Sequence, residues 1–222
     1  YDYLNVALQA GDQLMIKMDD TARKPGLAHG IAGYAWALGL LGEVSQEEKY
    51  QIEAQKLLVY ENTFYDGSTG NWEESESKKK SERKRVYWCH GAPGIALSRI
   101  MLKDIINSKD IKEDIDVALK TLISEGGIES HCLCHGTMGN VDILLTAAKE
   151  LNEELFMIQA LELTKIALDQ KKVHGWVHGL DPRAEMDGFM LGRTGIGYCL
   201  LRLKNPSIPS VLALQLPKGE NL

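Results

Sequence analysis

Long apolar runs, an excess of basic residues and many cysteines are all missing from this sequence of 222 residues. The longest apolar stretches, residues 31–41 and 141–148, are well short of the roughly 20 residues that span a bilayer. The formal net charge of −6 argues against nucleic acid or an anionic membrane as the main partner, because both select basic surfaces. We therefore expect a globular protein with no membrane span and no nucleic-acid partner.

The features of a secreted protein are also lacking. Tyr1 is followed at once by Asp2 and Asn5, without the basic and apolar segments of a signal peptide. Four cysteines are too few for a disulfide scaffold in a chain of this length, and Cys132 and Cys134 are too close in sequence to bridge easily. Reduced thiols in the cytoplasm are the better interpretation, and metal binding or catalysis is then their natural use.

What the sequence does contain is a short glycine motif that occurs four times. The copies are GLAHGIAG (26–33), WCHGAPG (88–94), LCHGTMGN (133–140) and GFMLGRTGIG (188–197). Each includes the pattern G-x-x-G, at Gly30/Gly33, Gly91/Gly94, Gly136/Gly139 and Gly192/Gly195. The first glycines are 61, 45 and 56 residues apart, a spacing that fits a helical hairpin with its connections.

The segments between the motifs predict two kinds of helix. After each G-x-x-G comes a nearly all-apolar stretch, such as 31–41 and 95–102, which predicts a buried helix. Residues 111–122 and 151–161 instead carry apolar residues at helical spacing with charged residues between them. Ser45, followed by Glu48, matches a capping box at the start of another such helix. Strand-type alternation is scarce, so we predict an all-α chain with an inner and an outer ring of helices.

One segment interrupts this scheme. From Phe64 to Tyr87 charged residues are dense and apolar residues scarce. Such a composition is most often that of a solvated, mobile connector rather than a specific binding site. We expect no functional residue there apart from Arg85, which is discussed below.

The two residues before the first glycine of each motif suggest a metal site. They are Ala28-His29, Cys89-His90, Cys134-His135 and Met190-Leu191. Equivalent positions in a ring converge on its axis, so Cys89, Cys134 and His135 would meet despite their separation in sequence. Thiolate and imidazole together favour Zn²⁺, and three protein ligands leave the open position typical of a catalytic zinc. A fourth ligand from Cys132 or His131 would instead make the site structural, and a lone buried cysteine is commonly just a small core residue.

The motifs GLAHGIAG, WCHGAPG, CHGTMGN and GFMLGRTGIGYCLLRL resemble those of the lanthionine synthetase C-like family, which includes the lantibiotic cyclases. The ending FMLGRTGIGYCLLRL, with NPSIPSVLAL soon after it, resembles the C-terminal cyclase domain of the bifunctional class II lanthipeptide synthetases. The resemblance implies an α/α toroid and a zinc ion bound by Cys89, Cys134 and His135. It also implies a lyase-type enzyme of lantibiotic biosynthesis. In that reaction a cysteine of a dehydrated precursor peptide is deprotonated at the zinc and adds to dehydroalanine or dehydrobutyrine, forming a thioether ring.

The same resemblance assigns two catalytic residues. His29, in GLAHG, matches the family segment that bears an active-site histidine, and we expect it to handle the proton of the addition. Its alternative is a hydrogen-bonded core histidine. Arg85 matches a family arginine that would steady the enolate or the substrate, with an ordinary surface position as its alternative. His90 is expected in the wall of the pocket.

The chain departs from the family in its extent. Only four of the seven helical hairpins of the toroid can be counted, and the chain begins with Tyr rather than Met. We therefore expect residues 1–222 to be the C-terminal portion of a cyclase domain, whose partner is the missing N-terminal part of the same protein or another chain. An aspartate of the family has no match here.

A competing function is a binding module of the same fold that holds zinc and captures thiols such as glutathione without forming rings. A third, a hydrolase that shares only the ring of helices, is disfavoured because the glycine motifs offer no paired carboxylates.

Overall fold

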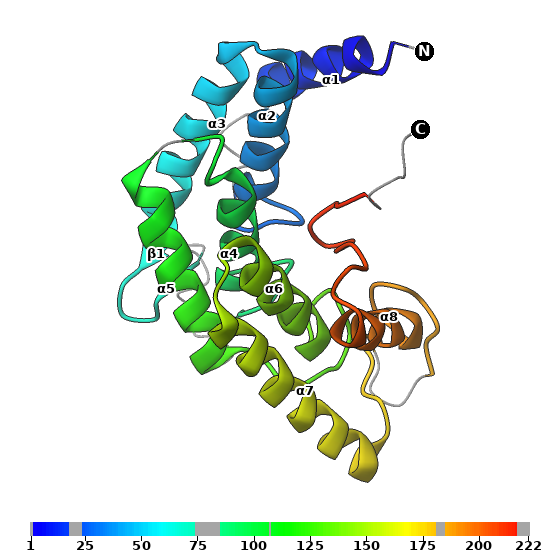
Figure 1. Ribbon diagram of the computed structural model, residues 1–222. Helices are drawn as coiled ribbons and strands as arrows, with labels where there is room; N and C mark the ends of the chain where they lie inside the picture. The colour runs from blue at the N-terminus through cyan, green and yellow to red at the C-terminus, as the bar shows by residue number, and fades with distance from the viewer. Residues whose placement is uncertain (1, 18–23, 74–84, 107, 181–184, 217–222) are drawn as a thin grey trace.

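The computed structural model describes residues 2–17, 24–73, 85–106, 108–180 and 185–216. Within them the chain forms eight α-helices that alternate between two layers (Figure 1). The inner layer consists of α2 (Ile31–Ser45), α4 (Ala92–Leu102), α6 (Thr137–Glu150) and α8 (Arg193–Lys204). The outer layer consists of α1 (Tyr3–Lys17), α3 (Glu48–Glu61), α5 (Lys109–Glu125) and α7 (Glu154–His174). The prediction of an all-α chain with inner and outer helices is confirmed.

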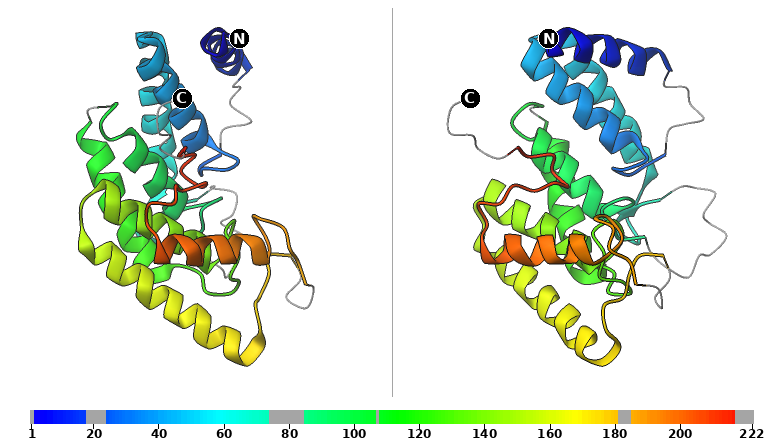
Figure 2. Two further views of the ribbon diagram at one scale, coloured as in Figure 1. Left: turned by 45° about the vertical axis from the view of Figure 1, so that its right-hand side comes forward. Right: turned by 90° about the vertical axis from the view of Figure 1, so that its right-hand side faces the viewer.

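The helices are arranged as an open arc. Each of α2, α4 and α6 packs against the outer helix that follows it, and the inner helices pack against one another in chain order from α2 to α8. Figures 1 and 2 show α1, α2 and α3 at one end of the arc and α7 and α8 at the other. The central helices α4 and α6 are buried over residues 92–100 and 137–147, as their apolar sequences predict.

The glycine pairs have a steric purpose that recurs in all four repeats. The first glycine is the N-cap of each inner helix, at Gly30, Gly91, Gly136 and Gly192. The second glycine of each pair is Gly33, Gly94, Gly139 or Gly195. If it carried a Cβ atom, that atom would lie only 1.9–2.3 Å from the backbone carbonyl oxygen of the residue six positions earlier. The loop before each inner helix therefore folds back against the first helical turn, where only glycine leaves room for it.

The outer helix α5 follows its sequence pattern. Its apolar residues at helical spacing are buried, namely Ile111, Ile115, Leu119 and Leu122. Its N-cap Ser108 accepts a hydrogen bond from the backbone N–H of Asp110 at 3.2 Å, which satisfies one of the free donors of the first turn. The pattern therefore identified both the helix and its buried face.

For α7 the sequence pattern identified the helix but the wrong face. Leu155, Ile158 and Leu161 are 53%, 46% and 51% exposed. The buried residues are Phe156, Ala160, Thr164 and Ala167. Small side chains at helical spacing let α7 lie close against α6, and the larger aliphatic residues are left on the outside.

Two local predictions need correction. The helix α3 has Glu47, not Ser45, as its N-cap, and the Ser45 hydroxyl instead accepts from the Glu47 N–H at 3.3 Å. The segment after α3 is also not wholly a solvated connector. It continues through a 3₁₀ helix (Asn62–Phe64) into a two-stranded antiparallel hairpin of β1 (Tyr65–Asp66) and β2 (Asn71–Trp72), and β2 is buried. Residues 74–84 of the expected connector lie outside the described residues.

No helix in the described ranges combines the length and the apolar character that crossing a bilayer requires. This finding agrees with the short apolar runs of the sequence.

Candidate metal centre

The four loops that precede the inner helices lie next to one another at the N-terminal ends of these helices. We call them loop 1 (residues 24–30), loop 2 (85–91), loop 3 (130–136) and loop 4 (186–192). The Cys89 N–H donates to the carbonyl of Cys134 at 3.3 Å, and the Cys134 N–H donates to the carbonyl of Met190 at 3.0 Å. These three residues occupy equivalent positions in their motifs, so the repeat register does bring equivalent residues together.

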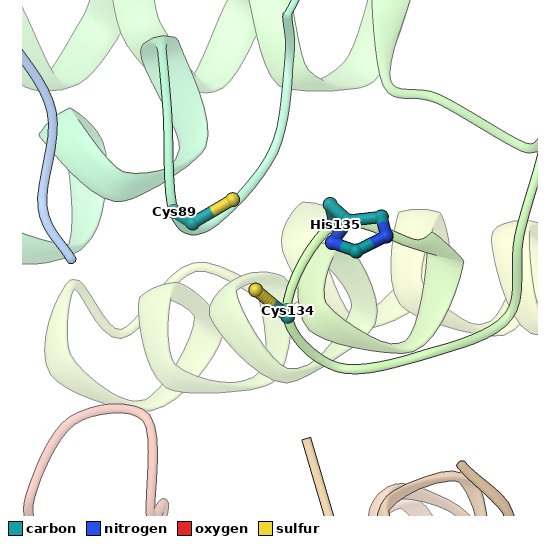
Figure 3. Close-up of side chains that lie close together, drawn as sticks. All are labelled: Cys89, Cys134 and His135. Atoms are coloured by element: carbon teal, nitrogen blue, oxygen red, sulfur yellow. The ribbon is translucent and has the colours of Figure 1, made fainter. Parts of the chain in front are cut away.

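Cys89 and Cys134 lie beside His135 at this junction. Their two Sγ atoms and a His135 ring nitrogen all lie within 4.8 Å of one another. Figure 3 shows the two sulfur atoms and the imidazole turned toward one another, with Cys89 on loop 2 and the other two on loop 3. In the part of the chain that the structure describes, no other group of three histidine, cysteine or acidic side chains is arranged to hold a metal ion.

A backbone carbonyl orients the ring of His135. Its Nε2 lies 2.6 Å from the carbonyl oxygen of Gly179. A carbonyl only accepts hydrogen bonds, so Nε2 carries a proton and Nδ1 is the ring nitrogen that remains for a metal ion. Metal-binding histidines are usually held in this way, with the second nitrogen bonded to a carbonyl or carboxylate.

The two thiols share a proton unequally. The Cys89 thiol donates a hydrogen bond to the sulfur of Cys134, and this bond, assisted by His135 and opposed by burial, lowers the pKa of Cys134 to about 6. The same hydrogen bond, together with burial, raises the pKa of Cys89. Two cysteine sulfurs, one of them readily ionised, and one imidazole nitrogen form a donor set that suits Zn²⁺.

The residues considered as a fourth ligand have other partners. The Cys132 sulfur lies 3.5 Å from the Ser130 hydroxyl and outside the cluster. His131 uses both ring nitrogens, since Nε2 bonds to Gln170 at 3.1 Å and Nδ1 accepts from the Val177 N–H at 2.9 Å. Burial lowers the pKa of His131. Neither side chain is placed to close the site.

His29 and Arg85 differ in their relation to this cluster. His29 is exposed rather than part of the core, its ring centroid lies 5.7 Å from that of His90, and it lines the same cavity as Cys134. Arg85 begins loop 2 and is exposed. Its backbone carbonyl accepts a hydrogen bond from Asn71, but its guanidinium makes no hydrogen bond or ion pair with the other described residues. The structure thus brings His29 beside the cluster and leaves the Arg85 guanidinium in solvent.

Loop 2 is closed differently from the other three loops. In loops 1, 3 and 4 the first N–H of the inner helix donates to the first carbonyl of the loop, each time at 2.8 Å. In loop 2 the side chain of Asn71 stands between the two groups. Its Oδ1 accepts from the Ala92 N–H at 2.7 Å, and its Nδ2 donates to the Arg85 carbonyl at 3.2 Å. Gly91 has φ +86° there, a conformation that favours glycine.

Loop 1 is held by a buried carboxylate from α3. One oxygen of Glu61 accepts from the N–H groups of Gly26 at 2.9 Å and Ala32 at 3.0 Å, and the other pairs with Arg99 at 2.8 Å. Burial raises the pKa of Glu61, and Arg99 opposes that effect. Neither Glu61 nor Asn71 was identified from the sequence, because both lie outside the glycine motifs and only folding brings them to the loops.

Comparison with known proteins agrees with the motifs. The sequence matches the family of lanthionine synthetase C-like proteins over residues 1–216. It is 28% identical over 218 residues to the lacticin 481/lactococcin biosynthesis protein LcnDR2 of Lactococcus lactis subsp. lactis, covering 90% of this chain and 23% of that protein. It is 26% identical over 148 residues to the nisin biosynthesis protein NisC of the same organism, covering 59% of this chain and 34% of that protein.

The solved structure of nisin cyclase has the same fold. It superposes with a TM-score of 0.54 at 22% identity, covering 83% of this chain and 47% of nisin cyclase. The chain thus spans less than half the length of each of these relatives. Four inner helices, each started by a glycine pair and backed by outer helices, form part of an α/α toroid, and the chain belongs to the lanthionine synthetase C-like family.

Proposed function

We propose that the chain is the zinc-binding part of a peptide cyclase. Its substrate would be a dehydrated precursor peptide, in which cysteine thiols are joined to dehydroalanine or dehydrobutyrine to form lanthionine rings. The observation that carries the proposal is the cluster of Cys89, Cys134 and His135, in which the hydrogen bond from Nε2 to Gly179 orients the His135 ring. Family membership supports the same reaction class.

In this proposal Cys89, Cys134 and His135 hold Zn²⁺ and leave one position for the substrate. Zinc bound there would lower the pKa of a substrate thiol, which is near ~8.5 when free, and so supply the reactive thiolate at neutral pH. Cys134 also lines the adjoining cavity, so a thiol that reaches the cluster arrives through that space. Because the substrate thiols must stay reduced, we propose that the reaction takes place in the cytoplasm.

The addition also requires a proton. As the sulfur bonds to the β-carbon of the dehydroamino acid, the electrons of the double bond move to the α-carbon, which must then be protonated. His29 is exposed on the cavity wall, and we assign it this proton transfer. Arg85 carries a solvated positive charge at the start of loop 2, and we assign it to steadying the peptide.

We further propose that residues 1–222 are the C-terminal portion of a cyclase domain. The relatives extend well beyond the matched region, and the arc of helices is open. The remaining helical hairpins would come from a preceding part of the same protein or from a partner chain.

Zinc content tests the ligand assignment directly. The purified chain should hold one zinc ion by elemental analysis, and Cys134→Ala should lose it. Cys199→Ala is the matched control, because Cys199 is also a free cysteine, but it is buried and its sulfur bonds to the Met138 carbonyl on α6. Stoichiometric zinc in folded Cys134→Ala would overturn the assignment.

Ring formation is tested with a dehydrated peptide. Its free thiols should disappear over time when they are counted by alkylation. The assay uses the zinc-loaded protein completed by its remaining hairpins. If that protein binds thiols but the number of free thiols in the peptide stays constant, it is the thiol-binding module instead.

A further inference from the structure

A cavity of about 500 Å³ lies beside the candidate metal centre. Its walls come from loops 1 to 4, from α2 and from the segment after α8, residues 205–216, which we call the C-terminal strap. His29 and Cys134 supply its polar side chains. The rest of the wall is apolar and includes Trp36, Met190 and Leu214. The volume is within the roughly 300–1,000 Å³ usual for ligand sites.

The strap is anchored by a buried polar network. Asp142 on α6 pairs with Arg202 on α8 and accepts from the Ser210 hydroxyl, and Asp142, Arg202 and Ser210 are all buried. The Ser210 hydroxyl in turn accepts from the Ala213 N–H at 3.0 Å. The strap therefore has a defined position, from which it presents apolar side chains to the cavity.

Two leucines of the strap meet the cavity in different ways. Leu212 is 2% exposed and forms part of the core, whereas Leu214 is 72% exposed. Leu214 is thus a cavity residue that solvent and an entering ligand both reach. Its replacement should alter the cavity with little effect on the core.

We infer that this cavity binds an apolar residue next to the reacting cysteine of the peptide, and that Leu214 helps to determine this selectivity. The inference rests on the proposed function, in which the peptide thiol reaches Cys134. Residues beside that thiol enter the apolar cavity and lose water. A charged side chain would meet few oppositely charged partners in the described wall, namely a protonated His29 for an acid and the Cys134 sulfur for a base. An aliphatic side chain instead gains by leaving water.

The test uses two pentapeptides in which a central cysteine is flanked by two leucines or by two aspartates. Binding to the zinc-loaded 222-residue chain is measured by calorimetry. The leucine peptide should bind at least ~10-fold more tightly, since a single methylene in an apolar pocket is worth 10-fold or more. Leu214→Lys should weaken binding of the leucine peptide by about 10-fold and strengthen that of the aspartate peptide, since the new ammonium pairs with a carboxylate.

Leu216→Lys is the matched control. Leu216 is 84% exposed on the same strap, but it is absent from the cavity wall. The variant adds the same charge nearby and should keep the leucine preference. Leu214→Ser, which adds no charge, should weaken binding of the leucine peptide without strengthening that of the aspartate peptide.

Failure of the inference and failure of the proposed function give different results. The titrations are repeated on the Cys134→Ser variant with peptides whose central residue is serine. In this pair any binding comes from the cavity alone, because the peptides carry no thiol to bind zinc. A preference for leucine flanks in this pair supports the cavity assignment even if the native chain holds no zinc. Equal binding of the two peptides to the native chain, or equal effects of Leu214→Lys and Leu216→Lys, would overturn it.

Discussion

At the candidate centre, single protons determine what each residue can do. The Gly179 carbonyl keeps a proton on Nε2 of His135, and the Cys89 thiol shares its proton with the sulfur of Cys134. The metal-free site therefore presents Cys134 mainly as a thiolate at neutral pH, before any ion is bound.

The first prediction concerns the reactivity of Cys134 in zinc-free protein. Its pKa of about 6 is below the ~8.5 of a free thiol, and only the thiolate reacts. Alkylation by iodoacetamide should therefore rise as pH increases through about 6 and level off above it. Mass spectrometry of the labelled peptide measures the rate. Cys89→Ala should move the midpoint upward because it removes the donor, and a midpoint near ~8.5 in the native chain would refute the shared proton.

The second prediction concerns His29. If it transfers the proton, His29→Asn should slow ring formation by about 10²–10⁴-fold, the usual contribution of a general acid or base. Zinc content and unfolding free energy should change little, because the side chain is exposed. His174→Asn is the control, an exposed histidine at the far end of α7 that should leave the rate unchanged. A folded, zinc-loaded His29→Asn protein that cyclises at the native rate would remove His29 from the mechanism.

The third prediction concerns Asn71. Without its side chain, loop 2 should close by a direct bond from Ala92 to Arg85, as the other loops do, and shift Cys89. Asn71→Ala should therefore weaken zinc binding by about 10–100-fold, as is usual for residues that orient metal ligands. Competition with a chromophoric chelator measures the affinity, and the thiolate-to-cobalt absorption of the Co²⁺ form should weaken with it.

Asn62→Ala is the control for Asn71. Asn62 bonds to Trp72 and Asp114, and among the described residues it makes no hydrogen bond to loop 2. Equal losses of zinc affinity in the two variants would mean that Asn71 acts through general stability alone.

Among the structural elements, the inner helices depend on the glycine that follows each N-cap by three residues. The fourth prediction compares two substitutions. A Cβ on Gly139 would lie 2.0 Å from the Leu133 carbonyl, whereas nothing lies within 4 Å of one on Gly197 in α8. Gly139→Ala should destabilise the fold by more than about 1 kcal/mol, and Gly197→Ala should stabilise it by about 0.5–1 kcal/mol. Denaturant unfolding measures both, and equal effects would contradict the steric account.

The outer helices show why periodicity identifies a helix better than its buried face. In α5 the large aliphatic residues and the buried residues coincide. In α7 they do not, because the face that packs against α6 includes small residues such as Ala160 and Ala167. Leu155 and Leu161 are left exposed as an apolar surface. A prediction from hydrophobicity alone therefore assigned the wrong face of α7 to the buried side.

At the scale of the whole molecule, the candidate centre links successive repeats of the arc. Cys89 precedes α4, and Cys134 and His135 precede α6, so a bound ion ties two inner helices together. Only the folded chain assembles these ligands, so the ion should stabilise the native state.

The fifth prediction concerns metal removal. At a free zinc concentration of 100 times the dissociation constant, binding adds about 2.7 kcal/mol to the unfolding free energy, or roughly 5–11 °C in Tm for a chain of this size. Chelation should lower the Tm by this amount while circular dichroism at 20–25 °C retains the helical signal. Cys134→Ala should have the low Tm with or without chelator. An unchanged Tm on chelation of zinc-loaded protein would exclude a centre that bridges the helices.

The sequence by itself determined the helical class, the inner and outer layers, and the cluster of Cys89, Cys134 and His135, because a repeated motif places equivalent residues at equivalent points of a ring. It could not determine which neighbours complete those loops. Asn71 and Glu61 carry no motif, and they reach loops 2 and 1 only through the path of the chain after α2. The cavity wall formed by Leu214 likewise depends on the Asp142–Arg202 pair, which joins residues 60 positions apart. Such contacts follow from three-dimensional packing, which no local spacing in the sequence records.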